Sequence, residues 1–259
     1  MPIVHYTQAV RGRLAFARTE QERRRLVSEL ARVAGARLLA FGHADEHLHN
    51  VLAHDRPGLL VRDLRGVLLR LRPDLQLKSP NVEEIDTRAY LRSTLDYVLR
   101  QAAQHRLAGV HPALWTGSCF QDLIGVRLLP GFDPGGIRRE LQRLQLRELY
   151  GVVGLPVEPI PQASDDALRR AGVARLADLA LAALAVGPDL TTRDAWTVRA
   201  RRVAARLTRR VGLALGDLAP YLGVGARALR MLAASGGDDV LAERAVRGRL
   251  TLEERIAGR

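Results

Sequence analysis

Several residue types are scarce in this chain of 259 residues, and each scarcity excludes a class of protein. Cys119 is the only cysteine, so an internal disulfide is excluded and a cytoplasmic protein is the plain expectation. No uninterrupted apolar run reaches the ~20 residues that cross a bilayer, so we expect no membrane partner. Residues 1–16 also lack the basic-then-apolar order of a secretory signal.

Lysine and histidine are unevenly used. Lys78 is the only lysine among the 40 basic residues, and all seven histidines lie at or before His111, so any histidine chemistry belongs to the first part of the chain. The net charge of +12 attracts polyanions, nucleic acid above all. GC-rich coding alone also produces an arginine bias, so charge by itself does not decide the function.

Apolar periodicity in the first part of the chain changes repeatedly between strand and helix. Thr19, with Glu22 three residues later, forms a capping-box pattern, and Thr87 is placed as a second N-cap. Strands are predicted within residues 3–10, 37–43, 47–54 and 75–86, and helices over 19–36, 57–72 and 87–109. The order β-α-β-β-α-β-α predicts an α+β protein with a ferredoxin-like split βαβ arrangement, in which helices cover one face of an antiparallel sheet.

The remainder of the chain shows helical patterns and no competing strand pattern. We predict a first domain over residues 1–153, a proline-rich linker over 154–163 and a helical domain over 164–259, with Ser164 as the N-cap of its first helix. The helices of this domain are predicted over residues 165–184, 191–212, 215–235 and 238–256.

The stretch HADEHLHNVL places two histidines one residue apart at the start of a predicted strand. Because side chains alternate along a strand, His47 and His49 point to the same face, about 7 Å apart. Two imidazoles at this spacing can share one metal ion. Histidine also suits half-buried strands, so a purely structural role stays open at this point.

The stretch YVLRQ forms a second candidate constellation. Positions four apart share one face of a helix, so Tyr97 and Gln101 project together. In a split βαβ fold, the helix after the last strand can pack on the sheet beside the central strands, where His47 and His49 are expected. The alternative is a core tyrosine with a surface glutamine.

Together these motifs resemble a known family. His47-Leu48-His49 fits the His-hydrophobic-His motif of the HUH nucleases, and YVLRQ fits the Tyr-x-x-x-Gln helix of single-strand DNA transposases that use one tyrosine. Over about residues 3–125 the flanking sequence is most similar to the REP-associated tyrosine transposases. Glu46 replaces the asparagine that usually precedes the first histidine, and QAA, residues 101–103, replaces the Asn-Pro pair that is common after the tyrosine. These departures concern the DNA target more than the chemistry.

The resemblance implies a metal-dependent single-stranded DNA endonuclease and strand transferase that acts near hairpins. His47, His49 and Gln101 would hold one Mg²⁺ or Mn²⁺ ion, and Tyr97 would attack the scissile phosphate to form a 5′-phosphotyrosine link. Related enzymes occur as monomers and as homodimers, so the oligomeric state stays open.

Neighbouring residues compete for these roles. Tyr90 is the rival nucleophile, but Thr94, not glutamine, follows it four residues later. His43 is the rival metal ligand, and we expect it to point away if the hairpin turn falls between it and His47. Three further residues have both a site role and a simpler surface role: Asp45, Glu46 and Lys78.

The helical domain carries the spacing of a helix-turn-helix. Gly223 lies in the turn, and Arg227 and Arg230 follow on the second helix, which could lie in a major groove. An arginine-rich helix precedes it and resembles C-terminal DNA-binding helices of long REP-associated members and of replication initiators; its candidate DNA-binding residues are Arg206, Arg209 and Arg210. A plain packing or dimerisation module is the alternative.

Our interpretation is therefore a transposase-like, single-tyrosine HUH nuclease in the cytoplasm, associated with the nucleoid. One alternative is a non-enzymatic DNA-binding regulator derived from such an enzyme. The other is an unrelated metal-binding α+β protein with a DNA-binding tail.

Overall fold

In a computed structural model, the chain divides into two compact units. The structure describes residues 1–12, 14–105, 109–186, 193–237 and 239–258. We call them the sheet unit, Met1–Leu123 with Gly131–Pro159, and the helical unit, Ile124–Pro130 with Ile160–Arg259. The predicted helix residues 106–108, 191–192 and 238 lie outside the described residues.

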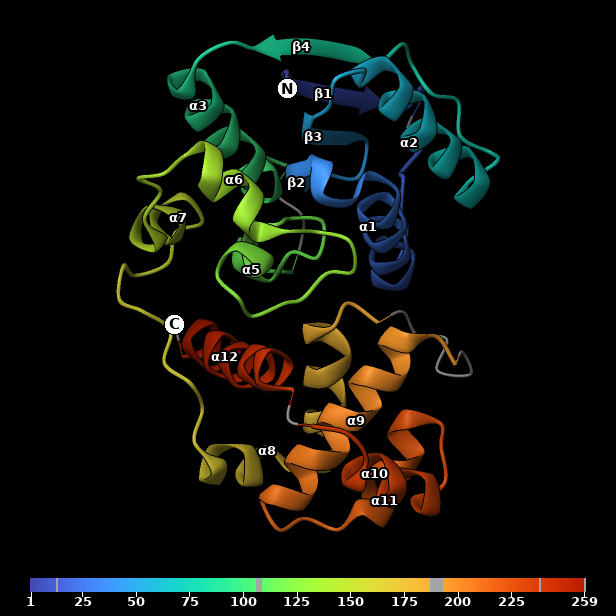
Figure 1. The fold of residues 1–259 in the computed structure, drawn as a ribbon, viewed down its shortest axis with the longest axis vertical. Coiled ribbons are helices and arrows are strands. Elements are labelled where there is room, and N and C mark those ends of the chain that lie inside the picture. Colours follow the sequence, from blue (N-terminus) through green and yellow to red (C-terminus); the bar gives the residue numbers. More distant parts are fainter. Residues whose placement is uncertain (13, 106–108, 187–192, 238, 259) are drawn as a thin grey trace. The chain divides into compact units, whose positions relative to one another are not determined.

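A four-stranded antiparallel sheet forms the centre of the sheet unit (Figure 1). Its strands are β1 (Ile3–Ala9), β2 (Leu38–His43), β3 (His47–Ala53) and β4 (Asn81–Ile85). The spatial order is β2-β3-β1-β4, and every neighbouring pair is antiparallel. The α+β class and the antiparallel sheet are thus confirmed. The chain skips one strand between β1 and β2 and again between β3 and β4.

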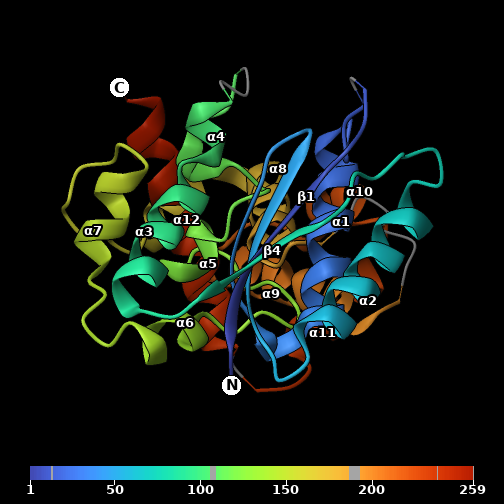
Figure 2. The same cartoon turned by 90° about the horizontal axis from the view of Figure 1, so that it is seen from above.

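Helices α1 (Glu20–Ala34) and α2 (Pro57–Leu71) connect these strands. They lie together on one side of the sheet, as Figure 2 shows. Thr19 caps α1 as expected, because its hydroxyl accepts a hydrogen bond from the Glu22 N–H. The carboxylate of Glu22, however, accepts from the N–H of Arg18, one residue earlier than a capping box requires.

The opposite side of the sheet carries α3 (Arg88–Leu99) and α4 (Gln101–Gln104) (Figure 2). Thr87 caps α3 by accepting from the N–H of Tyr90. One long helix was predicted here, but the backbone of Arg100 turns to φ −80° and ψ −6° and separates the two pieces. Helices are therefore present on both faces of the sheet rather than on one. The unit is completed by α5 (Phe120–Leu123), α6 (Pro134–Glu140) and α7 (Leu146–Val152), and by single 3₁₀ turns at Gly35–Arg37 and Pro112–Leu114.

The helical unit packs around leucine, valine and alanine side chains. Its helices are α8 (Asp165–Ala183), α9 (Ala195–Arg210), α10 (Leu215–Leu222), α11 (Ala226–Ala234) and α12 (Val240–Ala257). Ser164 caps α8 as predicted, accepting from the Ala167 N–H. The helix is not continuous, because Gly172 has φ 78° and ψ 172° and kinks it. Among the described residues, no helix combines the length and the apolar character needed to cross a membrane.

The division between the units differs in one place from the sequence interpretation. Residues 124–130 had been assigned to the first domain, but they belong to the helical unit. The N–H of Leu128 donates to the carbonyl of Ala183 at 2.7 Å, and the Leu128 side chain packs on the helical core. The chain finally passes from the sheet unit to the helical unit between Pro159 and Ile160, inside the predicted linker.

Candidate functional site

The register of the sheet fixes which side chains share a face with the histidine pair. His47 lies opposite Ala9 and His49 lies opposite Thr7, so both imidazoles project on the α3 side. Residues two positions apart share a face, and His5 therefore joins them from β1. The His47 and His49 ring centroids are 6.4 Å apart, with their planes inclined by 17°.

Gly42 brings α3 close to this face. It pairs with His49 across the β2–β3 ladder, and a Cβ atom at this position would overlap the main-chain carbonyl of Val98. Only a residue without a side chain lets α3 approach so closely. Tyr97, the neighbour of Val98, consequently lies beside His49.

The two aromatic side chains meet edge to face. The ring centroids of Tyr97 and His49 are 5.1 Å apart, and their planes are inclined by 89°. His49 is only 5 % exposed, whereas Tyr97 is 42 % exposed. The phenol is thus open to a large substrate while its ring rests on a buried imidazole.

Gln101 follows on the same helical row, one turn after Tyr97. Its side-chain Nε2 donates to the Tyr97 carbonyl at 3.2 Å and to Gln104 Oε1 at 3.0 Å. Its Oε1 is buried and has no hydrogen-bond partner. His105, a further turn along, lies 5.8 Å from His47 between ring centroids. Gln101 is therefore bracketed by two residues that each contact one histidine of the pair.

Burial disfavours the charged form of His5, His47 and His49. It lowers the pKa of His49 to about 3, and the neighbouring histidines add to the shift. Burial is also the main cause that lowers the pKa of His47 and of His5. Neutral imidazoles offer a nitrogen lone pair, which is the form that binds metal ions.

His5 and Thr7 belong to the site, although the sequence reasoning missed them. The Nδ1 atom of His49 lies 3.2 Å from His5 Nε2 and 3.2 Å from Thr7 Oγ1. The His5 ring also lies 6.1 Å from that of Tyr97. His5 and Thr7 are separated by one residue on a strand, the same pattern as His47 and His49, but only the β1–β3 register shows which face they share.

The rival nucleophile has a different environment. The Tyr90 hydroxyl donates to Glu83 Oε2 on β4 at 3.0 Å, and this hydrogen bond is the main cause that raises the pKa of the phenol. The hydroxyl of Tyr90 is thus engaged with a carboxylate that favours its protonated form, whereas Tyr97 contacts the histidines.

The other candidate metal ligands have surroundings that differ from those of His47 and His49. His43 faces the opposite side of the sheet, opposite Leu48, where its Nε2 lies 3.0 Å from Asn50 Oδ1. Asp45 pairs with Arg23 at 3.1 Å. Glu46 and Lys78 are exposed, and both charges act on His47, where Glu46 raises its pKa and Lys78 lowers it.

The predicted metal ligands are two imidazoles, of His47 and His49, and the side-chain amide of Gln101. Within the described residues, no group of three or more histidine, cysteine or acidic side chains is placed to hold a metal ion. A metal centre at this face therefore depends on Gln101 as a ligand beside His47 and His49. The unpartnered, buried Oε1 of Gln101 and the unpartnered Nδ1 of His47 are suitable donors for such an ion.

In the helical unit, a short turn joins α10 to α11, and the two helices are in contact. Gly223 ends α10 in the left-handed conformation, with φ 62° and ψ 29°, and α11 begins three residues later. Leu229 is buried, whereas Arg227 and Arg230 are exposed on α11. These two arginines are available to an external partner.

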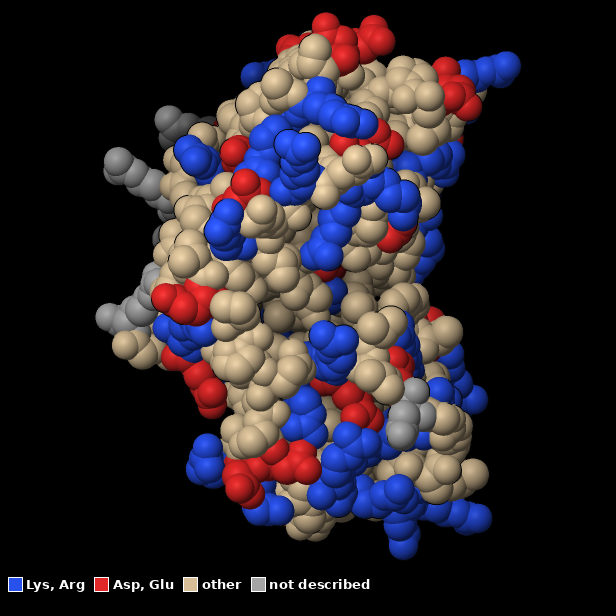
Figure 3. Space-filling view, turned by 60° about the vertical axis from the view of Figure 1, so that its left-hand side comes forward, with Lys and Arg blue, Asp and Glu red and all other residues tan. Residues whose placement is uncertain are grey.

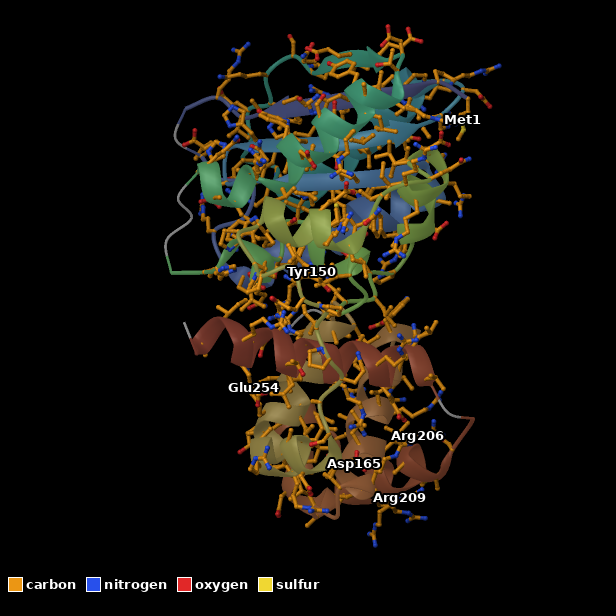
Figure 4. All side chains as sticks on the ribbon, turned by 90° about the vertical axis from the view of Figure 1, so that its left-hand side faces the viewer. Met1, Tyr150, Asp165, Arg206, Arg209 and Glu254 are labelled. Atoms are coloured by element: carbon orange, nitrogen blue, oxygen red, sulfur yellow. The ribbon has the colours of Figure 1, made fainter. Side chains whose placement is uncertain are left out.

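The predicted arginines of α9 have different surroundings. Arg206 is 8 % exposed, and its guanidinium donates to the carbonyls of Ser235, Gly236 and Gly237 after α11. Arg210 forms an ion pair with Glu243 at 2.5 Å. Arg209 is exposed, and Figure 4 labels it with Arg206 at the same end of the helical unit. Figure 3 shows that basic side chains are dense over this end of the unit, with acidic ones among them.

Comparison of the chain with protein-family models, with curated proteins and with solved structures found no match. The fold and the geometry of the site therefore carry the functional argument.

Proposed function

We propose that this chain is a metal-dependent, single-tyrosine nuclease and strand transferase of the HUH type that acts on single-stranded DNA. The observation that carries the proposal is the contact between Tyr97 and His49, which the sequence resemblance requires and which joins residues 48 positions apart. The strand order β2-β3-β1-β4, with a strand skipped in each βαβ unit, supports a ferredoxin-like sheet unit.

His47, His49 and Gln101 would hold one Mg²⁺ or Mn²⁺ ion. Imidazole and amide donors suit these hard cations less well than carboxylates, and they leave the centre cationic and attractive to a phosphate. When bound, the ion would polarise the scissile phosphate and stabilise charge on its oxygens. The exposed ammonium group of Lys78, whose charge acts on His47, is a further contact for that phosphate.

Tyr97 supplies the nucleophile. Its oxygen forms a bond to phosphorus as the bond between phosphorus and the 3′ oxygen breaks, and the phenol proton leaves while the 3′ oxygen gains one. The products are a 5′-phosphotyrosine and a free 3′-hydroxyl. Because the phosphodiester energy is retained, attack by a 3′-hydroxyl can rejoin strands. The half-exposed position of Tyr97 gives a DNA strand access to the phenol.

The helical unit would hold duplex or hairpin DNA next to the cleavage target. Arg227 and Arg230 on α11 are the candidate groove contacts, and Arg209 is a candidate phosphate contact. Arg206 and Arg210 are engaged within the unit, so we assign them supporting roles.

A covalent-adduct assay tests the proposal. The full chain is incubated with Mn²⁺ or Mg²⁺ and a labelled library of single-stranded hairpins, and adducts are separated in SDS. We expect an adduct with the wild type and with the matched control Tyr90→Phe, none with Tyr97→Phe, and a greatly reduced yield with His49→Ala. An adduct that persists in Tyr97→Phe would disprove the assigned nucleophile.

The same assay separates the alternatives. Binding to many DNA sequences without an adduct favours the non-enzymatic regulator, for which the exposed arginines of α11 would suffice. No DNA affinity at low salt favours an unrelated metal-binding protein.

A further inference from the structure

We propose that His5 is a positioning residue: its Nε2 accepts the Nδ1 proton of His49 and so leaves Nε2 of His49 as the metal-binding nitrogen. This inference rests on the proposed function, because it concerns the same metal centre. Thr7 assists from the position directly opposite His49.

The contact geometry supports this role. His49 Nδ1 lies 3.2 Å from His5 Nε2 and 3.2 Å from Thr7 Oγ1, so both partners converge on one nitrogen of the ring. The His5 and His49 rings lie 5.3 Å apart between centroids with planes inclined by 26°. The ring of Tyr97 also packs against His49, perpendicular to it and 5.1 Å away between centroids, so the His49 ring has little freedom to turn.

The chemistry of imidazole then selects the tautomer. A neutral imidazole has one N–H and one lone pair, and a ligating nitrogen must carry the lone pair. In proteins, a metal-bound histidine usually donates its other N–H to a neighbouring acceptor, which fixes both the tautomer and the ring orientation. Here the acceptors at Nδ1 are an imidazole nitrogen and a hydroxyl oxygen, and neither is among the expected ligands.

The other nitrogen of His5 completes the arrangement. Glu83 lies opposite His5 in the β1–β4 register, and its carboxylate interacts electrostatically with that ring. A neutral His5 ring that carries its proton on Nδ1, the nitrogen that does not face His49, has Nε2 free to accept.

Imidazole NMR of the wild type provides the first test and needs no metal. A long-range ¹H–¹⁵N spectrum of the full chain should show the His49 proton on Nδ1. A predominant Nε2–H tautomer of His49 would overturn the inference, whatever the protein does to DNA.

Mn²⁺ titration followed by electron paramagnetic resonance provides the second test. We expect His5→Leu to weaken the Mn²⁺ affinity by about 10- to 100-fold, the range seen when an outer-shell partner is removed. His5→Gln keeps an acceptor oxygen and should restore most of the affinity. His54→Leu changes a histidine that is not among the rings in contact with His5, His47 or His49, and it should bind Mn²⁺ as the wild type does. The circular dichroism spectrum of each variant checks that it is folded, and Thr7→Val gives a milder loss if His5→Leu does not fold.

The outcomes separate this inference from the function on which it rests. If the wild type binds no Mn²⁺, the proposed metal centre fails, and the NMR spectra of the wild type and of His5→Leu still decide whether the His49 proton lies on Nδ1 and whether His5 keeps it there. If the wild type binds Mn²⁺ and both His5→Leu and Thr7→Val bind it equally well, the positioning role is disproved while the metal centre stands.

Discussion

The ring of Tyr97 stands perpendicular to the imidazole of His49, with 5.1 Å between their centroids. One ring comes from a helix and the other from a central strand, and the glycine of the neighbouring strand, Gly42, sets the separation between them. The relationship is therefore sensitive to changes that lie outside the candidate site.

Gly42→Ala should damage both the fold and the site. The new methyl group would meet the Val98 carbonyl, a backbone atom that cannot move without shifting α3. We expect a loss of about 1–3 kcal/mol in the free energy of unfolding, typical of overpacking, and a lower adduct yield. Urea unfolding measures the first quantity. Gly66→Ala in α2, where an added Cβ meets nothing within 4 Å, is the matched control and should be stabilised by about 0.5–1 kcal/mol.

Acid should destabilise the sheet unit through its buried histidines. The pKa of His49 is lowered to about 3 in the fold, below the ~6.5 of an unfolded histidine. The unfolded chain therefore binds more protons below pH ~6.5, so stability is retained above that pH and falls as the pH decreases toward 3. At pH 4.5 we expect this histidine to cost about 2–3 kcal/mol. Urea unfolding of the wild type and His49→Asn at pH 7 and 4.5 measures it, and an equal pH dependence of the two proteins would contradict the prediction.

Two arginines that look alike in the sequence should behave in opposite ways. Arg230→Ala should leave the free energy of unfolding within about 0.5 kcal/mol and reduce the slope of log affinity against log salt for hairpin DNA by about one. Arg206→Ala should destabilise the helical unit by about 1–3 kcal/mol, because it leaves the carbonyls after α11 without their hydrogen-bond donor. Fluorescence anisotropy and urea unfolding give the two readouts. A salt slope that is unchanged in Arg230→Ala would remove α11 from the DNA interface.

For Gly172→Ala, the sequence pattern and the observed backbone angles predict opposite changes in the free energy of unfolding. A glycine within a long helical pattern predicts that alanine stabilises the protein by about 0.5–1 kcal/mol. The observed φ of 78° and ψ of 172° belong to a region that glycine alone adopts readily, so we expect a loss of about 1–3 kcal/mol instead. Thermal unfolding decides the sign.

Local patterns in the sequence predicted the elements well. The hydroxyls of Thr19, Thr87 and Ser164 cap the helices that were placed behind them, and two strand-like runs joined by a short polar turn located the hairpin that carries His47 and His49. Each of these features depends on residues within a few positions of one another, which is why periodicity and capping chemistry find them.

Features set by register and by close approach were not predictable in this way. Nothing near His5 in the sequence shows that it lies beside His49, because that depends on the register in which β1 pairs with β3. Likewise, the buried location of Arg206 depends on the loop after α11. The kink at Gly172 lies inside a continuous helical pattern, which does not reveal it. The role of Gly42 became visible only when α3 was placed on the sheet.

The imidazole contacts between β1 and β3 join residues 44 positions apart in the chain. Neither strand alone, as a peptide, would reproduce them, so the cluster exists only while the sheet is assembled. A ligand that recognises the assembled cluster and not the open chain must stabilise the fold, by about 2.7 kcal/mol at a free concentration of 100 times its Kd. Thermal shift is thus a means of ranking candidate ions without any knowledge of the DNA target.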